Sequence, residues 1–100
     1  MRAIHVDLAD GNRPVLVLTR EAVRPFLTSV TVAPITTRIR GLPSEVAVGP
    51  ANGLDNTSVV SCDNLRTVNV EALGRWIGDL LPEQEPALAA AISAAFDLAE

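Results

Sequence analysis

Short apolar runs, each ended by a proline, a glycine or a cluster of polar turn residues, are the feature that most constrains this fold. Runs of this length between turn residues are typical of β-strands. They occupy residues 3–8, 13–20, 30–35, 44–48 and 58–64. Only the stretch after Pro82 spaces its apolar residues as a helix does. The order therefore predicts a mainly β fold of about five or six short strands, a small antiparallel barrel or curled sheet closed by a C-terminal helix.

The first two runs predict a β-hairpin. Residues 3–8 ("AIHVDL") alternate, and this alternation predicts a half-buried strand. One face is predicted to hold Ile4, Val6 and Leu8, and the other His5 and Asp7. The "ADGN" segment that follows predicts a tight turn in which the Asp-Gly pair takes positive φ. Residues 13–20 ("RPVLVLTR") are apolar on both faces, which indicates a central strand.

Prolines mark where the middle of the chain bends. Pro25 is predicted to end a single helical turn in the connection 21–29. Pro34 is predicted to bend the third strand or to break its ladder just before Thr36, because proline has no N–H to donate.

The last third of the chain predicts a short strand and then the helix. Residues 70–81 are expected to form a helical turn and a strand, with Trp76 and Ile77 in the core. From Pro82 onward an apolar stripe indicates an amphipathic helix. Its predicted members are Leu88, Ile92, Ala95 or Phe96, and Ala99.

Composition bounds the class of protein. One hundred residues, 48% of them hydrophobic and 20% charged, indicate one globular domain spanning residues 1–100. No apolar run approaches the ~20 residues that span a bilayer, so no membrane association is expected. Asp7 and Asp10 interrupt the region where an export signal needs its apolar stretch, which indicates a cytoplasmic protein. With one cysteine, Cys62, and one histidine, the chain offers too few ligands for a structural zinc site, and no metal or cofactor is expected.

Charge is distributed unevenly along the chain. The net charge is −4, and all eight cations are arginines. Residues 1–66 hold seven arginines against six carboxylates, whereas residues 67–100 hold only Arg75 against six carboxylates. The acidity therefore comes from the C-terminal third, and a small cationic groove in the first two thirds is compatible with the composition.

Polar side chains gather where three predicted strands begin or end. Arg13 opens the second strand, Arg38 and Arg40 follow the third, and Arg66 follows the fifth. In a curled sheet these places can meet at one rim, where guanidinium, threonine and asparagine groups would hold a phosphodiester. The alternative is that they are solvent-facing residues paired with Asp63 or Glu45. Spacing alone leaves both open.

Five segments, in order, resemble the MazF/PemK/Kid family of bacterial toxins over nearly the whole chain. They are "HVDL", "NRPVLVL", "VAPITTRI", "GLDNTSVVSCDNLRTV" and "LGRWIGDLLPEQE". The resemblance implies an SH3-like β-barrel with a C-terminal helix, generally a homodimer. It also implies a sequence-specific, metal-independent endoribonuclease of a type II toxin–antitoxin system.

The resemblance assigns roles to particular residues. Arg13, before Pro14, and Thr36, in "PIT", take the catalytic positions. The predicted RNA contacts are Asn12, Thr37, Arg38, Asn64 and Arg66. The implied partners are single-stranded RNA and a MazE-like antitoxin. An acidic, disordered tail of that antitoxin is expected to lie over Arg13, Arg38 and Arg66.

The implied chemistry uses the RNA itself as nucleophile. A ribose 2′-hydroxyl attacks the neighbouring phosphorus while the enzyme orients it and neutralises the phosphate oxygens. Arg13 and Thr36 suit those tasks, and Asp10 or His5 would assist the proton steps if the fold brings either close. Two alternatives stay open: a CcdB-like toxin that binds a protein target, and an inactive paralogue, since the 9–12 loop is shorter than is usual in the family.

Overall fold

Residues 2–98 are described by a computed structural model, in which seven strands precede one α-helix. The strands are β1 (Ala3–Asp7), β2 (Arg13–Val17), β3 (Ser29–Thr36), β4 (Glu45–Val48), β5 (Ser58–Ser61), β6 (Arg66–Asn69) and β7 (Leu73–Asp79). The helix is α1 (Glu85–Ala95). Four single 3₁₀ turns are η1 (Arg24–Phe26), η2 (Pro50–Asn52), η3 (Val70–Ala72) and η4 (Pro82–Gln84). The mainly β class with a C-terminal helix is confirmed, with β6 as a separate strand beyond the predicted five or six.

One curled antiparallel sheet runs in the order β4-β5-β3-β2-β1-β7, and β6 pairs with β3 off this path. The first half of β3 pairs with β6 up to Val32, and its end pairs with β5 from Ile35. Pro34 lies between these two stretches, where its missing N–H costs no bond to either partner. The strand thus continues through Pro34 while its outer partner changes there.

A loop rather than a ladder joins the two ends of the sheet. Asn52 of η2 is buried, and its Nδ2 donates to the carbonyl of Asp79 at the end of β7. Gly53 follows in the left-handed conformation at φ 86°, and a Cβ there would lie 2.3 Å from the carbonyl oxygen of Ile77. The backbone of this loop therefore packs directly on β7 and completes the barrel-like shape.

Two apolar clusters fill the interior. One lies between the sheet and α1 and includes Ile4, Leu16, Val60 and Leu88. The other is a valine cluster on the opposite face of the same strands, made by Val15, Val17, Val30, Val32 and Val68. Residues of β2 enter both clusters in alternation, which confirms the prediction that this strand is central.

The predicted alternation of the first strand is wrong at its end. Asp7 is 0% exposed, whereas Leu8 is 56% exposed. β1 ends at Asp7, whose carboxylate accepts from Arg66 and from the backbone N–H of Ala9, so the polar side chain is satisfied inside. Leu8 belongs to the turn, where the strand pattern no longer holds.

Trp76 was predicted in the core and is 57% exposed, although Ile77 packs on the core as expected. The register between β1 and β7 shifts between Ile4 and His5, and Trp76 pairs with His5. The indole N–H donates to Asp79 at 3.3 Å on the outer surface. A register shift of this kind reverses which side chains point inward, and the sequence pattern does not reveal it.

The C-terminal helix forms as its apolar stripe predicts. Leu88 and Ala91 are buried, and Ile92 and Ala95 pack against the same cluster. Phe96 lies beyond the end of the helix and is exposed, so Ala95 takes the predicted position. Ala99 lies outside the described residues.

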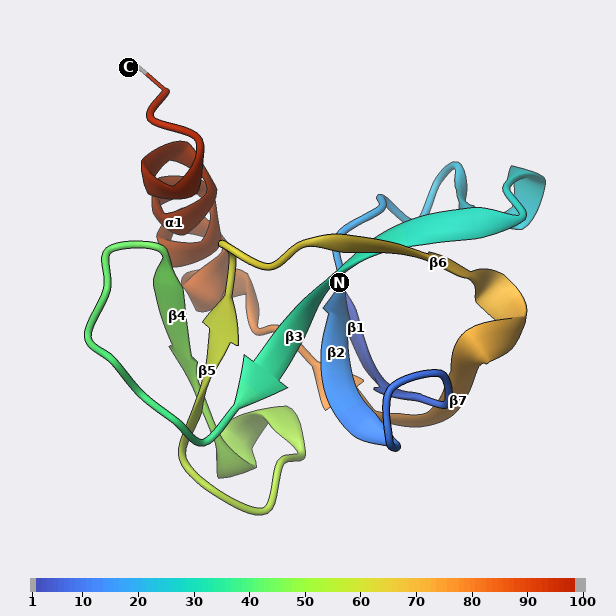
Figure 1. The fold of residues 1–100 in the computed structure, drawn as a ribbon, viewed down its shortest axis with the longest axis horizontal. Helices are drawn as coiled ribbons and strands as arrows, with labels where there is room; N and C mark the ends of the chain where they lie inside the picture. Colours follow the sequence, from blue (N-terminus) through green and yellow to red (C-terminus); the bar gives the residue numbers. More distant parts are fainter. Residues whose placement is uncertain (1, 99–100) are drawn as a thin grey trace.

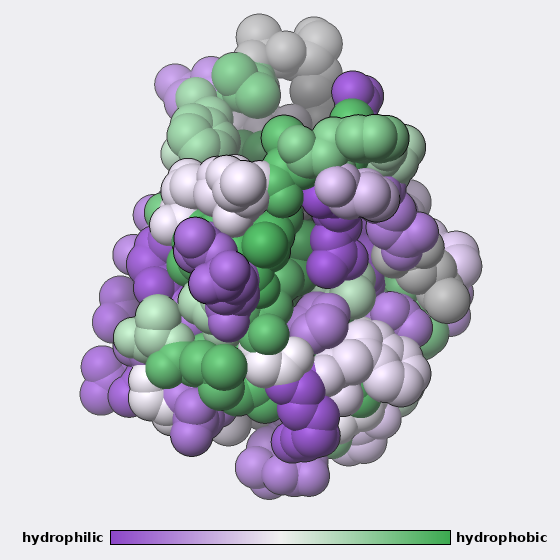
Figure 2. Space-filling model, turned by 90° about the vertical axis from the view of Figure 1, so that its right-hand side faces the viewer, coloured by the Kyte–Doolittle hydropathy of each residue, from purple (hydrophilic) through white to green (hydrophobic). Residues whose placement is uncertain are grey.

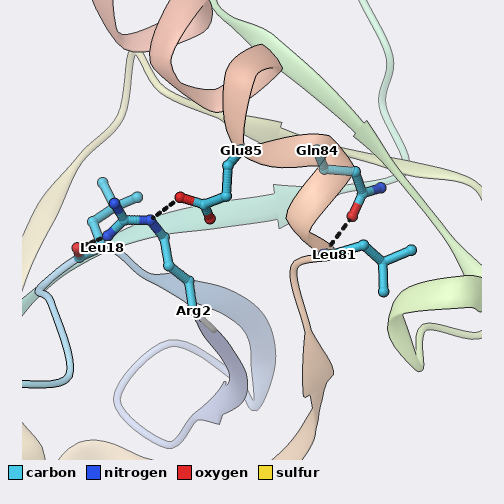
Figure 3. A network of polar contacts seen from close by, with 5 residues as sticks. All are labelled: Arg2, Leu18, Leu81, Gln84 and Glu85. Carbon is cyan, nitrogen blue, oxygen red and sulfur yellow. Dashed lines mark hydrogen bonds and ion pairs between the residues drawn. The ribbon is translucent and has the colours of Figure 1, made fainter.

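Side chains fix the start of the helix (Figure 3). Gln84 Oε1 accepts from the N–H of Leu81 at 2.9 Å, which is the half of a capping box that the third residue of the turn supplies, while Leu81 itself offers no capping side chain. Arg2 donates to Glu85 at 3.1 Å and to the carbonyl of Leu18 at 2.5 Å. The first helical turn is thereby tied to the strands next to it.

The surface carries apolar area as well as charge. Figure 2 shows an apolar strip between polar groups on the face to the right of Figure 1. Exposed large apolar side chains include Phe26 and Leu27, in and after η1, a turn that contains Pro25 rather than ending at it. In residues 2–98, no helix is both long and apolar enough to cross a membrane.

Candidate nucleic-acid interface

Two adjoining cavities, of about 560 and 700 Å³, share Arg13, Thr36 and Thr37. We call the two together the groove. The first also holds Asn12, Pro14, the loop 53–58 and Arg75. The second also holds Arg38, Arg40, Ser61, Asp63 and Asn64. The predicted catalytic pair therefore lies at the junction of the two cavities.

Arg13 is placed by the turn before it. Its N–H donates to the carbonyl of Asp10 at 3.1 Å, which closes the turn as β2 begins. Gly11 and Asn12 both take left-handed φ values of 59°. Asparagine tolerates this conformation better than most residues, so Asn12 and not Asp10 is the second left-handed residue.

Thr36 is placed by the register of β3. Val15 and Pro34 are the last pair that β2 and β3 align, and two residues further along β3 Thr36 pairs with Val59 of β5. The Thr36 Oγ1 accepts from the N–H of Arg38 at 3.1 Å. Its own proton remains available for donation to a ligand.

The carboxylates near the arginines are bound to other groups. Glu45 accepts from the backbone N–H groups of residues 40, 41 and 42, with Gly41 the shortest at 2.8 Å. Asp63 accepts from the hydroxyl of Ser44 at 2.5 Å. Within residues 2–98, the guanidinium groups of Arg13, Arg38 and Arg40 make no ion pair. The alternative pairing with Asp63 or Glu45 is not observed.

The remaining predicted contacts divide into two groups. Asn12 and Asn64 line opposite parts of the groove, and Asn64 donates to the hydroxyl of Ser61 at 2.9 Å. Arg66 lines neither cavity. Its guanidinium contacts Asp7, and the same Nη2 lies 3.6 Å from Asp10.

The structure adds groove residues that the sequence did not single out. Arg75 of β7 lines the first cavity, together with Asp55, Asn56 and Ser58 of the loop that packs on β7. The polar run "LDNTS" after Gly53 was the available signal for the loop. Arg75 gave no signal, because it is an isolated cation in the acidic third of the chain.

Other titratable groups are bound elsewhere. His5 Nδ1 lies 3.0 Å from the carbonyl of Gly74 between β1 and β7, and neither His5 nor Asp10 lines the groove. Cys62 is buried; burial raises the pKa of its thiol, and the Asp63 charge adds to the rise. No group of three or more His, Cys, Asp or Glu side chains placed to hold a metal ion occurs in residues 2–98.

The groove has the chemistry of a phosphodiester site. Arginine fits phosphate bidentately, and hydroxyl and amide groups donate hydrogen bonds to phosphate oxygens and base edges. Four arginines lie along it, namely Arg13, Arg38, Arg40 and Arg75, against the three carboxylates of Glu45, Asp55 and Asp63, although the protein carries a net charge of −4. Local charge, rather than net charge, is what an anionic ligand meets in a groove.

Comparisons with known proteins agree with the architecture. The family of PemK-like, MazF-like toxins of type II toxin–antitoxin systems matches residues 5–96. Endoribonuclease MazF3 of Mycobacterium tuberculosis strain H37Rv is 64% identical over 98 residues, which are 98% of this chain and 95% of that protein. The solved Mycobacterium tuberculosis toxin MazF-mt6 superposes with a TM-score of 0.95 and 63% identity, covering 99% of this chain and 100% of that one.

A further solved structure contains a partner. It is an endoribonuclease in complex with its cognate antitoxin, from Mycobacterial species, with a TM-score of 0.85 and 28% identity. The match covers 99% of this chain and 94% of that one. The sequence resemblance is thus confirmed across almost the full length, and the chain belongs to the PemK-like, MazF-like toxins of type II toxin–antitoxin systems.

Proposed function

We propose that this protein is a sequence-specific endoribonuclease toxin that cleaves single-stranded RNA and is held inactive by a cognate antitoxin. The observation that carries the proposal is the groove, in which Arg13 and Thr36 lie where two cavities meet. Among residues 2–98, the guanidinium groups of Arg13, Arg38 and Arg40 make no ion pair. The names of the relatives, endoribonuclease MazF3 among them, support the same activity.

The proposed reaction is attack by a ribose 2′-hydroxyl on the adjacent phosphorus. Arg13 neutralises the negative charge that grows on the non-bridging oxygens, and Thr36 donates a hydrogen bond to one of them. A cation and a donor fixed at the ends of neighbouring strands need little rearrangement when the charge develops, so they favour the transition state over the bound substrate.

The proposed RNA contacts lie on both sides of this pair. Asn12 lines the first cavity, and Thr37 borders both. Arg38 and Asn64 line the second cavity and would hold the neighbouring phosphate and base. Two cavities that meet at the reacting bond suit a strand that runs through the groove, with nucleotides bound on either side of the cut.

The assembly that we propose is a homodimer in the cytoplasm, and it needs no metal cofactor. While inactive, it is bound to a MazE-like antitoxin. The solved relative with its cognate antitoxin supports the existence of such a partner. An inactive paralogue is the remaining alternative. The match to MazF-like toxins gives no support to a CcdB-like binding toxin.

An RNA-cleavage assay with matched arginine variants tests the proposal. The unmodified protein is expected to cut RNA, and Arg13→Ala to lose about 10²-fold or more of the rate, as expected when a group that stabilises the transition-state charge is removed. Arg24→Ala is the control, because Arg24 lies in η1 and lines neither cavity of the groove. A protein without activity on any RNA, or an Arg13→Ala variant as active as Arg24→Ala, would refute the proposal.

A further inference from the structure

Asp7 is a fully buried charge next to the site. Its side chain is 0% exposed, and the other buried polar side chains in residues 2–98 are uncharged. Its Oδ2 contacts Arg66 Nη2, and its Oδ1 accepts from the N–H of Ala9 at 2.9 Å. Burying a carboxylate is strongly unfavourable unless it is paired and hydrogen-bonded. Arg66 is therefore required by Asp7, whatever else it does.

The place of Asp7 connects this pair to the groove. Asp7 and Arg13 are the last residues that β1 and β2 align, directly opposite each other. Asp7 also holds the turn between them, since its carbonyl accepts from Asp10 at 3.3 Å and its carboxylate from Ala9. That turn ends with Asn12 and Arg13.

By occupying the Asp7 carboxylate, Arg66 also affects Arg13. Side chains directly opposite in an antiparallel pair point to the same face, with Cβ atoms about 4.5–5.5 Å apart. Without Arg66, the nearest arginine in that register to the Asp7 carboxylate is Arg13. An Arg13 bound to Asp7 would no longer be free to meet a phosphate.

We propose that Asp7 and Arg66 form a positioning pair that fixes the turn 8–12 and keeps Arg13 unpaired and directed at the groove. Arg66 then acts through Asp7 and not by contacting RNA, unlike the role that the family resemblance implies for it. The inference rests on the proposed nuclease function for its kinetic test, and on the fold alone for its structural one.

The kinetic test is a double-mutant cycle with Asp7→Asn, Arg66→Gln and the double variant, at a temperature where circular dichroism shows each to be folded. Arg66→Gln is expected to lower kcat about tenfold, with KM changed by less than about threefold, because displacement of a catalytic group reduces the rate more than binding. In the Asp7→Asn background, Arg66→Gln should change kcat by less than about twofold, since coupled residues are not additive. Arg66→Lys should recover part of kcat.

A groove arginine provides the matched control. Arg38→Gln is expected to raise KM and to lower the salt slope of RNA binding by about 0.7, the value for one phosphate contact on a single strand. Its effect should be additive with Asp7→Asn. If Arg66→Gln instead raises KM, lowers the salt slope and adds to Asp7→Asn, Arg66 contacts RNA and the positioning pair is refuted.

Hydrogen exchange tests the pair without any activity. Arg66→Gln should speed exchange at the amides of Ala9, Asp10 and Arg13, which close the turn, and leave Leu88 in α1 unchanged. Unchanged exchange in the turn would overturn the proposal even if the protein cuts RNA. Faster exchange in the turn of a protein that cuts no RNA would leave the pair standing and refute the nuclease.

Discussion

Arg38 and Arg40 are available to a ligand because Glu45 and Asp63, the carboxylates that line the same cavity, already have partners. Glu45 binds three backbone N–H groups, and Asp63 binds Ser44. A carboxylate that accepts several fixed hydrogen bonds gains little by moving to a surface arginine, whose exposed pairing is worth only about 0–1 kcal/mol. The positive side of the groove thus depends on where its acids are bound as well as on its arginines.

The proposed role of the Thr36 hydroxyl, donation to a phosphate oxygen at the reacting bond, can be tested by substitution. Thr36→Ala should lower kcat of RNA cleavage about 10-fold or more, since a donor to the developing charge is lost. Thr36→Ser should retain most of the rate, because serine keeps the hydroxyl that accepts from Arg38 and donates to the phosphate. Single-turnover kinetics measure the rate of the cleavage step separately from RNA binding. A serine variant as slow as the alanine variant would show that the hydroxyl is not the active feature.

Cys62 predicts a pH effect of known sign. Burial raises the pKa of its thiol above the ordinary 9.0, so the folded protein holds the neutral form. The unfolded chain ionises first as pH rises, and the stability associated with the neutral thiol is present below about pH 9 and lost above it. As the pH rises from about 8 to about 10, the free energy of unfolding measured in urea should fall less for Cys62→Ala than for the natural protein. An equal loss in both would contradict this.

The strands and the helix were largely predictable, because each is short and bounded by turn residues. The tight turn after β1 and the central β2 follow from local chemistry. Positive φ falls on Gly11 and Asn12 rather than on the predicted Asp-Gly pair, and at Pro34 the strand changes its outer partner instead of bending or losing its ladder. The burial of Asp7 and the exposure of Trp76 did not follow. Both depend on where β1 ends and on register shifts against β7, and these are set by contacts between strands that are far apart in sequence.

Closure of the sheet predicts a matched pair of glycine variants. A Cβ at Gly78 would lie 2.0 Å from the carbonyl oxygen of Asn52, whereas a Cβ at Gly49 meets nothing closer than 3.7 Å. Gly78→Ala should therefore separate the 49–54 loop from β7 and destabilise by about 2 kcal/mol or more, as overpacking does. Gly49→Ala, at an extended φ of 179°, should change stability by less than about 1 kcal/mol. Urea unfolding measures both; similar stabilities would refute the closing role.

Four of the eight arginines line one groove, although the last third of the chain is acidic. Spacing along the sequence left open whether the strand-end arginines and threonines meet at one rim. Arg13, Thr36 and Arg38 do line one groove, whereas Arg66 does not. Arg75 and the loop 53–58 were missed, because no local pattern shows which loop folds over which strand.

An acidic antitoxin segment is predicted to occupy this groove and to compete with RNA. The affinity measured by calorimetry should fall as the salt concentration rises from about 50 to about 500 mM, because salt screens the attraction between the acidic segment and the arginines. At physiological ionic strength, which lies within this range, the Debye length is roughly 8 Å. Arg38→Ala should weaken binding, and Arg24→Ala should not. A partner indifferent to salt and to Arg38→Ala would bind somewhere else.

Cleavage of an RNA with one 2′-deoxyribose at the cut position distinguishes the proposed chemistry from any other. The substituted strand keeps its phosphates and bases, so it should bind within a few-fold of the natural strand yet remain uncut. The natural strand should be cut equally well with a chelator present, leaving a 2′,3′-cyclic phosphate and a 5′-hydroxyl. Cutting of the deoxy-substituted strand, or loss of activity on chelation, would mean that water or a metal ion performs the attack, and would contradict the role assigned to Arg13 and Thr36.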